Sequence, residues 1–465
     1  MLRLFRQYYP IRNIFFVMGE GIFIYASVLA AAFIISGPSA LHEQPWFYAK
    51  LFFITLVCQA CLYYNELYDL NIVDSLKELA VRLMQSFGVA GIFLGFVYLA
   101  FPETIIGSLI FMIGVGIVIV AITCWRFGYS LALNRGLFNQ QIILLGSGDL
   151  TRKIREEINA RKDCGYTVAV EVPECIDDSD PGRPAEVPLI CRNKFEGLCE
   201  LSQGLGIKKI VVSFREKRSI FPTQELLRCR VGGIDIIEGN SFYEMLTGKL
   251  LVEFINPSWL IFSNGFQKSR MRRIVKRAVD LILSSAMLIA LSPLLLLVAV
   301  AIKLDSPGPV FFSQMRVGER HRIYRMHKFR SMVKDAEKLS GPVWAQKNDP
   351  RVSRVGRFLR RFRIDELPQL WNVLKGEMSF VGPRPERKEF VQELEGIVPY
   401  YRERFSVKPG ITGWAQVNFG YCATIRESIE KLNYDFFYIK NMSNLMDLLV
   451  MLRTVKILLF GHGVR

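Results

Sequence analysis

The sequence lacks the features that define several common classes of protein. Its nine cysteines show no paired metal-ligand spacing, and its 35 glycines and 20 prolines follow no fixed period, which excludes a small disulfide scaffold and a collagen-like repeat. Disorder is excluded as well, because 51% of the 465 residues are apolar. Acidic side chains are scarce, with 43 against 59 lysines and arginines. The net charge of +16 and the positive mean hydropathy of +0.24 together indicate contact with lipid and with an anionic partner.

Four apolar stretches occupy the first third of the chain, at residues 14–36, 48–68, 84–101 and 105–125. Each is close to the roughly 20 residues that a helix needs to cross a bilayer. Lysine and arginine flank the start of the first stretch, the second connection and the end of the fourth, whereas the first and third connections carry none. The positive-inside rule then predicts a retained four-helix transmembrane bundle over residues 1–135, with both of its ends in the cytoplasm. Reduced thiols are expected for the cysteines of such a cytosol-facing protein. Glu20 and Glu66 are either functional groups or buried polar contacts between helices.

Residues 136–265 alternate between strand-like and helix-like segments. The run QQIILLGSGDLTRKIREEINARK reads as a strand, a glycine turn at Gly146–Gly148 and a helix, and further strands are expected at residues 167–172, 209–213 and 234–237. This alternation predicts a Rossmann-like α/β domain with a parallel sheet. Thr151 stands where a dinucleotide-binding fingerprint has its third glycine. A nucleotide-binding domain and a docking or regulatory domain both remain open.

Residues 266–465 form the third region, which begins with six basic residues in KSRMRRIVKR and continues into an apolar run at residues 279–304. Ser292 and Pro293 interrupt this run, and proline bends a helix by removing a backbone hydrogen bond. Positive charge flanks both ends, which favours the same side of the membrane for both. A re-entrant helix and a kinked span fit these residues equally well.

Two arginine-rich clusters follow, at residues 316–330 and 351–363, and the second leads directly into Asp365 and Glu366. In the second cluster Val355, Phe358, Leu359 and Phe362 have helical spacing, so we expect this face to pack while the other presents guanidinium groups. Arginine lowers the pKa of a nearby carboxyl group, so one acid can remain an ionised nucleophile while its neighbour binds a divalent cation. Such a pair suits phosphoryl transfer, in which cations neutralise the phosphate oxygens.

At these residues the sequence resembles the bacterial sugar transferase family, the monotopic polyprenyl-phosphate hexose-1-phosphate transferases. The resemblance covers residues 270–460 and rests on KRAVD, the Ser292-Pro293 break, SPGPVFFSQMRVGE, HKFRSM, RIDELPQLWNVLKGEMSFVGPRPE and KPGITGWAQV. The bundle and the α/β domain resemble the large members of the family. TGKLLVEFINPSWLIFSNGF is similar to the branch associated with EpsB/PEP-CTERM-type exopolysaccharide loci.

The resemblance implies a catalytic domain over residues 266–465 that transfers a hexose 1-phosphate from a UDP-sugar to undecaprenyl phosphate and releases UMP. By motif position Asp365 is the nucleophile that forms a phosphoryl-aspartate intermediate, and Glu366 binds Mg²⁺. The same matching assigns substrate binding to six residues, namely Lys328, Arg330, Arg360, Pro383, Arg384 and Pro385. For each basic residue a structural salt bridge or a lipid contact is the competing interpretation.

Further expectations concern the surroundings of the site. Tyr434, Asp435 and Tyr438 form another polar cluster, of which Asp435 is a weaker site candidate. The apolar tail at residues 445–460 is either a surface-lying amphipathic helix or a core helix, and the family fold favours the surface helix. The family also implies membrane lipids as partners, a homodimer, and an active site on the cytoplasmic face of the bacterial inner membrane. We expect no nucleic-acid partner.

Two other classes of function compete with the transferase. A non-catalytic membrane scaffold or regulator of a polysaccharide assembly complex would use the α/β domain, but it would not need Asp365, Glu366 and Arg384 together. An NAD-dependent sugar-nucleotide enzyme centred on Gly146–Gly148 is disfavoured by the missing third glycine and by the lack of a Tyr-x-x-x-Lys pair in the α/β region. The identity of the hexose and any ligand of the α/β domain do not follow from the sequence.

Overall fold

The computed structural model divides the chain into two compact units, Met1–Arg3 with Tyr8–Phe242, and Leu4–Gln7 with Tyr243–Arg465. The residues that it describes are 2–4, 7–9, 11–43, 46–68, 76–136, 139–161, 164–173, 195, 197–214, 221–255, 257–263, 265–333, 351–420 and 424–460. Strands β1 (Leu2–Leu4) and β2 (Gln7–Tyr9) pair near the beginning of the chain.

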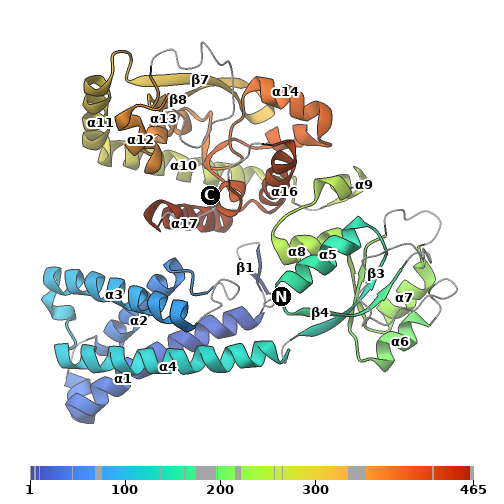
Figure 1. Ribbon diagram of the computed structural model, residues 1–465, viewed down its shortest axis with the longest axis horizontal. Helices are drawn as coiled ribbons and strands as arrows, with labels where there is room; N and C mark the ends of the chain where they lie inside the picture. The colour runs from blue at the N-terminus through green and yellow to red at the C-terminus, as the bar shows by residue number, and fades with distance from the viewer. Residues whose placement is uncertain are drawn as a thin grey trace. The chain divides into compact units, whose positions relative to one another are not determined.

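The first third of the chain folds into four helices that pack side by side (Figure 1). They are α1 (Ile11–Glu43), α2 (Phe47–Tyr64), α3 (Leu76–Ala100) and α4 (Ser108–Asn134), with the short 3₁₀ turn η1 (Pro102–Thr104) before the last. Each contains a segment that is long and apolar enough to cross a membrane. The four predicted membrane helices are therefore confirmed, and the protein is membrane-associated.

The two acidic residues singled out in the sequence, Glu20 and Glu66, are paired with arginines. Glu20 of α1 is fully buried, and its Oε1 lies 2.6 Å from an NH2 atom of Arg126 on α4, whose NH1 also donates to the carbonyl of Leu67. Glu66 lies 3.6 Å from Arg82 of α3. The first contact joins α1 to α4 and the second joins the segment after α2 to α3, so the geometry matches the polar-contact interpretation of both acids.

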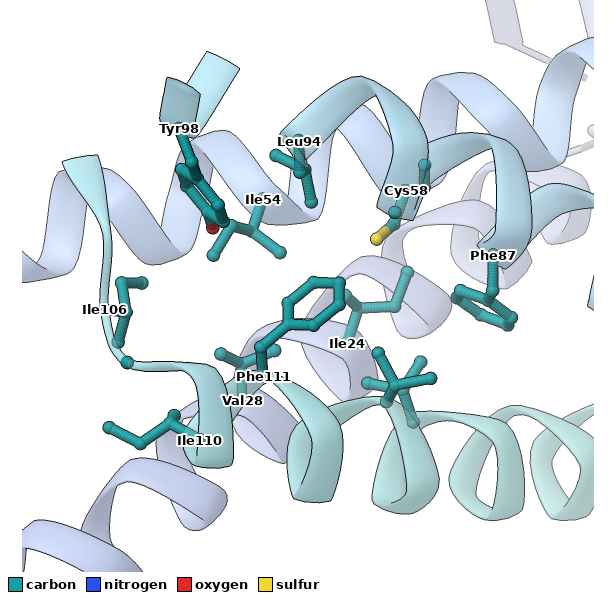
Figure 2. Close-up of a pocket in the computed structure, with 15 residues that line it drawn as sticks. Ile24, Val28, Ile54, Cys58, Phe87, Leu94, Tyr98, Ile106, Ile110 and Phe111 are labelled. Atoms are coloured by element: carbon teal, nitrogen blue, oxygen red, sulfur yellow. The ribbon is translucent and has the colours of Figure 1, made fainter. Parts of the chain in front are cut away.

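An apolar pocket lies between the helices of the bundle (Figure 2). Ile24, Ile54, Phe87 and Ile110 point into it from the four different helices, and Tyr98 closes one end. Its free volume is about 30 Å³, and its walls are almost entirely hydrocarbon. A space of this size and chemistry stays dry and holds no substrate, so it is a packing gap of the bundle.

The middle of the chain forms a four-stranded parallel sheet, as predicted. The strand order is β4 (Tyr166–Val172), β3 (Gln140–Leu145), β5 (Lys209–Val212) and β6 (Asp235–Glu238). The helices of this region are α5 (Asp149–Ala160), α6 (Leu198–Gly204), α7 (Thr223–Val231) and α8 (Gly239–Thr247). Figure 1 shows α5 on one face of the sheet and α6 with α7 on the other. Because both faces are covered, β3 is apolar along its buried length instead of alternating.

The glycine turn after β3 is held from inside the domain. Gly146 has a φ of +130°, and a Cβ there would lie 2.8 Å from the hydroxyl of Ser213. Thr151, which replaces the third glycine of the fingerprint, shares a 2.7 Å hydrogen bond with that hydroxyl. Glu171 at the end of β4 is paired with Arg155 of α5 at 3.2 Å. The side chains that a dinucleotide would contact thus bind each other.

The second unit holds the remaining elements of the chain. Its helices are α9 (Pro257–Phe262), α10 (Arg270–Ala290), α11 (Ser292–Asp305), α12 (Arg354–Arg361), α13 (Gln369–Lys375), α14 (Lys388–Ile397), α15 (Trp414–Asn418), α16 (Ile425–Asn441) and α17 (Asn444–Phe460). Its strands are β7 (Phe311–Val317), β8 (Ile323–Phe329), β9 (Ser379–Val381) and β10 (Gly410–Thr412), and its 3₁₀ turns are η3 (Val252–Phe254), η4 (Glu319–His321), η5 (Ile364–Glu366) and η6 (Tyr401–Ser406). Strands β7 and β8 form an antiparallel hairpin, whereas β9 and β10 pair in parallel.

The core of this unit is built around α16, which is buried along most of its length. The segment after α8 packs into the same core, because the backbone N–H of Leu250 donates to the carbonyl of Asn433 and the indole of Trp414 donates to the carbonyl of Gly248. Residues 243–265, which we grouped with the α/β domain on sequence grounds, therefore belong to the compact unit that contains α16. Helix α17 combines the two expected alternatives, because Met446 and Val450 are buried in the core while Leu445 and Leu452 are exposed.

Helices α10 and α11 meet at a bend of 61° at Leu291, immediately before Ser292 and Pro293. The first part of α10 is bound to the core by polar side chains: Asp280 accepts hydrogen bonds from the hydroxyl of Ser379 and the N–H of Phe380, both at 3.1 Å. Lys276 forms an ion pair of 2.6 Å with Asp447. Beyond Asp280 the exposed side chains of α10 and α11 are largely apolar.

Candidate functional site

The two acids of the DE pair lie on η5, a single 3₁₀ turn between α12 and α13. Helix α12 is capped by the hydroxyl of Ser353, which accepts a 3.0 Å hydrogen bond from the N–H of Gly356. After α12 the chain turns sharply at Arg363, whose φ of +53° lies in the left-handed region that non-glycine residues seldom adopt. This turn ends the arginine-rich helix and directs Asp365 and Glu366 inward, where each is only 8% exposed. Backbone strain of this kind is concentrated at functional sites.

Asp365 is buried among charged groups without being bound by any of them. Within the described part of the chain no hydrogen bond or ion pair engages its carboxylate. Burial raises its pKa, and so does the adjacent Glu366, while Lys328, Arg360 and Arg384 act in the opposite direction. A carboxylate with a raised pKa and free oxygens is a better nucleophile than an ordinary aspartate, provided that it is ionised.

Glu366 is held by cations from two other elements. Its Oε1 accepts a 2.9 Å hydrogen bond from Lys328 of β8 and another of 2.9 Å from Arg384, while an NH1 atom of Arg363 lies 3.9 Å from Oε2. Burial alone would raise the pKa of Glu366, but these three cations outweigh it and keep that pKa well below its usual range. Glu366 is therefore a permanent anion whose Oε2 has no close partner among the described residues.

The turn Pro383-Arg384-Pro385 places Arg384 beside Glu366, and two arginines, of which Arg404 is buried, donate hydrogen bonds to the carbonyls of this turn. Arg404 donates to the carbonyl of Arg384 at 2.7 Å, and Arg316 of β7 donates to the carbonyl of Pro385 at 3.1 Å. The pKa of Arg384 is raised, chiefly by Glu366, so the guanidinium stays charged. Because it remains 37% exposed, Arg384 can contact both Glu366 and a ligand.

The remaining basic candidates divide into one that faces the site and one that does not. Arg360 donates its Nε–H to the hydroxyl of Ser331 at 2.9 Å, and its positive charge lowers the pKa of Asp365. Arg330, in contrast, donates four hydrogen bonds to the end of α11, to the carbonyls of Ile302, Ser306 and Pro307 and to the hydroxyl of Ser306. The structure thus brings together Lys328, Arg360, Asp365, Glu366 and Arg384, and it uses Arg330 to fix α11.

The expectation that four apolar residues of α12 form one packed face is wrong for two of them. Leu359 is buried and Val355 packs against the same small core as Phe329. Phe358 and Phe362 are 57% and 45% exposed, and their rings lie 4.8 Å apart. Successive helical positions point about 100° apart, and in α12 Leu359 faces the core while Phe358 points away from it.

Asp435, the weaker candidate, lies behind the turn that carries Arg384. It accepts a 2.8 Å hydrogen bond from Arg404 and is 1% exposed. Tyr438 donates its hydroxyl proton to Asp447 at 2.7 Å, and the same hydroxyl oxygen lies 3.0 Å from the carbonyl oxygen of Val381. Sequence reasoning missed Arg404 and placed Arg316 only within an arginine-rich cluster, because the groups that they contact are distant in the chain.

Comparison with known proteins places this site in a family. The model of the family described as bacterial sugar transferase matches residues 271–461. A UDP-N-acetylgalactosamine-undecaprenyl-phosphate N-acetylgalactosaminephosphotransferase of Aeromonas hydrophila is 42% identical over 240 residues, which cover 52% of this chain and 56% of that protein. A UDP-glucose:undecaprenyl-phosphate glucose-1-phosphate transferase of Escherichia coli (strain K12) is 43% identical over 40% of both chains. An exopolysaccharide production protein, PSS, of Rhizobium leguminosarum bv. phaseoli is 43% identical over 39% of this chain and 94% of its own length. The first two matches span about half the length of these relatives.

Proposed function

The chain belongs to the bacterial sugar transferase family, and from this premise we propose that it transfers a hexose 1-phosphate from a UDP-sugar to undecaprenyl phosphate. The observation that carries the proposal is the contrast between the two acids of η5. Glu366 is bound by Lys328 and Arg384, whereas the neighbouring carboxylate of Asp365 is surrounded by positive charge and has no partner within the described residues. The reaction would start an exopolysaccharide or O-antigen repeat unit.

The proposed reaction has two displacements at phosphorus. In the first, an oxygen of Asp365 attacks the β-phosphorus of the UDP-sugar, the bond from this phosphorus to the bridging oxygen breaks, and UMP leaves with the electron pair. A sugar-phosphoryl ester of Asp365 remains. In the second, an oxygen of undecaprenyl phosphate attacks the same phosphorus, and the carboxylate of Asp365 is regenerated. Lys328, Arg360 and Arg384 offset the charge of the phosphates, which is the main catalytic requirement of phosphoryl transfer.

The donor set of the site fits Mg²⁺ bound together with substrate. No group of three or more histidine, cysteine, aspartate and glutamate side chains exists among the described residues, so these residues form no closed metal cage. Mg²⁺ is usually held by one or two carboxylates and by the phosphates of a substrate. Oε2 of Glu366 is the oxygen that would hold it, since Oε1 accepts from both Lys328 and Arg384. When bound, Mg²⁺ would offset charge that develops on the leaving phosphate.

We further propose that α10 and α11 enter one leaflet and return as a re-entrant helix. Asp280 of α10 is fixed to β9, and Ile302 and Ser306 near the end of α11 are fixed to Arg330, so both ends are attached to the same compact unit. Between these points each arm has about 10 residues, or about 15 Å of helix, which is half of a hydrocarbon core of about 30 Å. The 61° bend lies between the arms. Both active-site acids would then lie at the cytoplasmic face of the inner membrane, where nucleotide sugars are available.

Topology can be tested by thiol labelling in intact cells. A single cysteine in place of the exposed Lys388 would be introduced into a chain without its nine native cysteines. We expect an impermeant thiol reagent to leave it unmodified until the cells are opened. Labelling in intact cells would place the site outside the cell and refute this topology.

The function is tested by UMP release from a panel of UDP-sugars, with the protein in lipid nanodiscs, Mg²⁺, and undecaprenyl phosphate present or absent. We expect one sugar nucleotide to give UMP, with turnover only when the acceptor is present. Asp365→Asn should abolish release while the thermal unfolding midpoint stays unchanged, and ³²P from a β-labelled donor should remain on the wild-type protein when the acceptor is absent. Normal turnover by Asp365→Asn would refute the mechanism, and no UMP from any UDP-sugar would favour the scaffold.

Two finer features are part of the same proposal. The four-stranded parallel sheet, with its strand order of β4, β3, β5 and β6, supports a Rossmann-like domain. Its glycine turn is closed by Thr151 and Ser213, so we assign the domain a docking or regulatory role instead of nucleotide chemistry. A homodimer is the expected state, and light scattering of the protein in nanodiscs or detergent would test it.

A further inference from the structure

A second group of cations lies in the compact unit that contains Asp365 and Glu366, which we call the catalytic unit (Leu4–Gln7 with Tyr243–Arg465). These cations lie where α13 ends against α10. Arg277 of α10 donates to the carbonyls of Val373 and Leu374, at 2.6 and 2.8 Å, and so covers the last turn of α13. Lys408, in the segment before β10, lies beside it. A Cβ on Gly376 would lie 3.2 Å from NH2 of Arg277 and 3.4 Å from Nζ of Lys408, so both cations border the same small space.

The charges around Lys408 are unbalanced. Within the described part of the chain no hydrogen bond or ion pair reaches its ammonium group. Burial lowers the pKa of Lys408, and Arg277 and Lys276 lower it further. The acids that act on it, Glu319 and Asp280, do not offset this effect, and Asp280 is already bound to β9. Two cations held together without an acid between them would be stabilised by an anion.

Gly376 keeps the space between the two cations open. It follows the last residue of α13 with a φ of +85°, a conformation that favours glycine at the end of a helix. Any side chain at this position would meet the guanidinium of Arg277, as the 3.2 Å approach of a bare Cβ shows. The absence of a side chain thus serves the helix end, and it also means that no side chain at position 376 covers the two cations.

The surroundings of this space are those of a membrane interface. Arg277 lies on a helix with exposed apolar residues on both sides of it in the sequence, since Ile274 is 55% exposed and Ile282 is 71% exposed. On α13, Trp371 is half exposed and Lys375 lies 5.6 Å from its ring. Tryptophan with a neighbouring lysine is typical of the headgroup region of a bilayer. The anion available at that depth is the phosphate of a phospholipid.

We propose that the space bordered by Arg277, Lys408 and Gly376 binds the phosphate group of an anionic phospholipid headgroup. The phosphate oxygens would accept hydrogen bonds from Lys408 and from the remaining N–H groups of Arg277, as charge-assisted pairs do elsewhere. One bound lipid would then contact α10, α13 and the segment before β10 together. This inference uses the membrane placement of α10 proposed above, but it does not depend on the transferase reaction.

The test measures the acylation rate of single lysines in the intact wild-type chain by peptide mass spectrometry. Nanodiscs of phosphatidylcholine alone are compared with nanodiscs containing phosphatidylglycerol, and with the first type plus inorganic phosphate. Lys303, an exposed lysine in the last turn of α11, is the matched control, because it reports the general surface potential at the other end of the same helical pair. We expect phosphatidylglycerol to slow acylation of Lys408 about tenfold relative to Lys303, since one unit of pKa changes the fraction of free amine tenfold.

Each outcome has a defined meaning. Slowing by phosphatidylglycerol alone supports a lipid headgroup site, and slowing by inorganic phosphate as well supports a phosphate site that is also open to soluble ions. Equal slowing of Lys303 and Lys408, or no slowing of either, overturns the proposal. UMP release measured on the same nanodiscs keeps the two proposals apart, because protection of Lys408 without activity would refute only the transferase.

Discussion

The turn that carries Arg384 depends on one buried acid, Glu386. Its carboxylate forms an ion pair with Lys431, and it lies 3.8 Å from Arg316 and 4.0 Å from Arg404. Arg316 and Arg404 are the residues that hold the carbonyls of Pro385 and Arg384. Glu386→Gln preserves the shape of the side chain and removes its charge, so Lys431 and Arg316 would face a neutral amide, while Arg404 would keep its ion pair with Asp435.

The size of the effect follows from the pKa of Glu386. Burial raises this pKa, but Lys431, Arg404 and Arg316 together lower it from 4.5 to about 2. A lowered pKa stabilises the folded state above the unfolded value, and the contribution is lost as the pH falls from about 4.5 through about 2. A shift of roughly 2.5 units corresponds to about 3 kcal/mol, in the range found when one partner of a buried ion pair is removed. At pH 7.5 the full contribution is present.

The assay is thermal unfolding of wild type and variant in the same nanodiscs at pH 7.5, followed by donor kinetics below the transition. For a unit of about 200 residues, about 3 kcal/mol lowers the midpoint by roughly 6–12 °C. We expect the KM for the UDP-sugar to rise in the folded variant, because the turn beneath Arg384 is loosened. Glu393→Gln, at an exposed position of α14, is the control and should shift the midpoint by less than a degree or two. Equal midpoints for Glu386→Gln and wild type would refute the reasoning.

Three further changes test other contacts. Burial and Glu366 raise the pKa of Asp365, so as the pH is lowered, UMP release should fall at a higher pH than an ordinary aspartate would give. Glu366→Gln should shift this acidic limb of the pH–rate profile to lower pH. An acidic limb at the same pH in the variant would contradict the assignment. Asp280→Ala leaves the N–H of Phe380 unpaired and should lower the free energy of unfolding by about 2 kcal/mol, measured as a lower thermal midpoint. Arg330→Met should lower the free energy of unfolding by about 3 kcal/mol, because it removes the hydrogen bonds at the end of α11, and it should leave the KM for the UDP-sugar unchanged in the folded protein. A tenfold higher KM with unchanged stability would instead indicate that Arg330 contacts the substrate.

The sequence predicted the features that depend on local pattern. The four membrane helices and the four parallel strands follow from hydrophobic runs and their spacing, and the structure confirms them. Asp365 and Glu366 were found because they stand directly after a run of arginines. The structure added that the two differ: Glu366 is bound by two cations and Asp365 is not. That difference depends on β8 and on the turn at Arg384, which lie 37 residues before and 19 residues after Asp365 in the chain.

Other features could not be read from the sequence because tertiary contacts decide them. Arg330 stands two residues after Lys328, immediately after β8, yet its guanidinium donates to the carbonyls at the end of α11. Phe358 and Leu359 look equivalent in an apolar pattern, but only Leu359 reaches the core. Arg404 is paired with Asp435, which lies 31 residues further along the chain, and no local sequence pattern predicts a pair at this separation.

The attachment of α10 and α11 to the catalytic unit also bears on how such proteins are assembled from parts. Asp280 and Arg330 join both ends of the bent pair to the same core that supports Asp365. In the re-entrant arrangement proposed above, this unit would be anchored in the bilayer by α10 and α11, independently of α1–α4. A relative of which 94% is matched by 39% of this chain shows that a protein of this family can consist largely of the matched region. Helices α1–α4 and the parallel sheet are then additions that evolution could gain or exchange without rebuilding the catalytic unit.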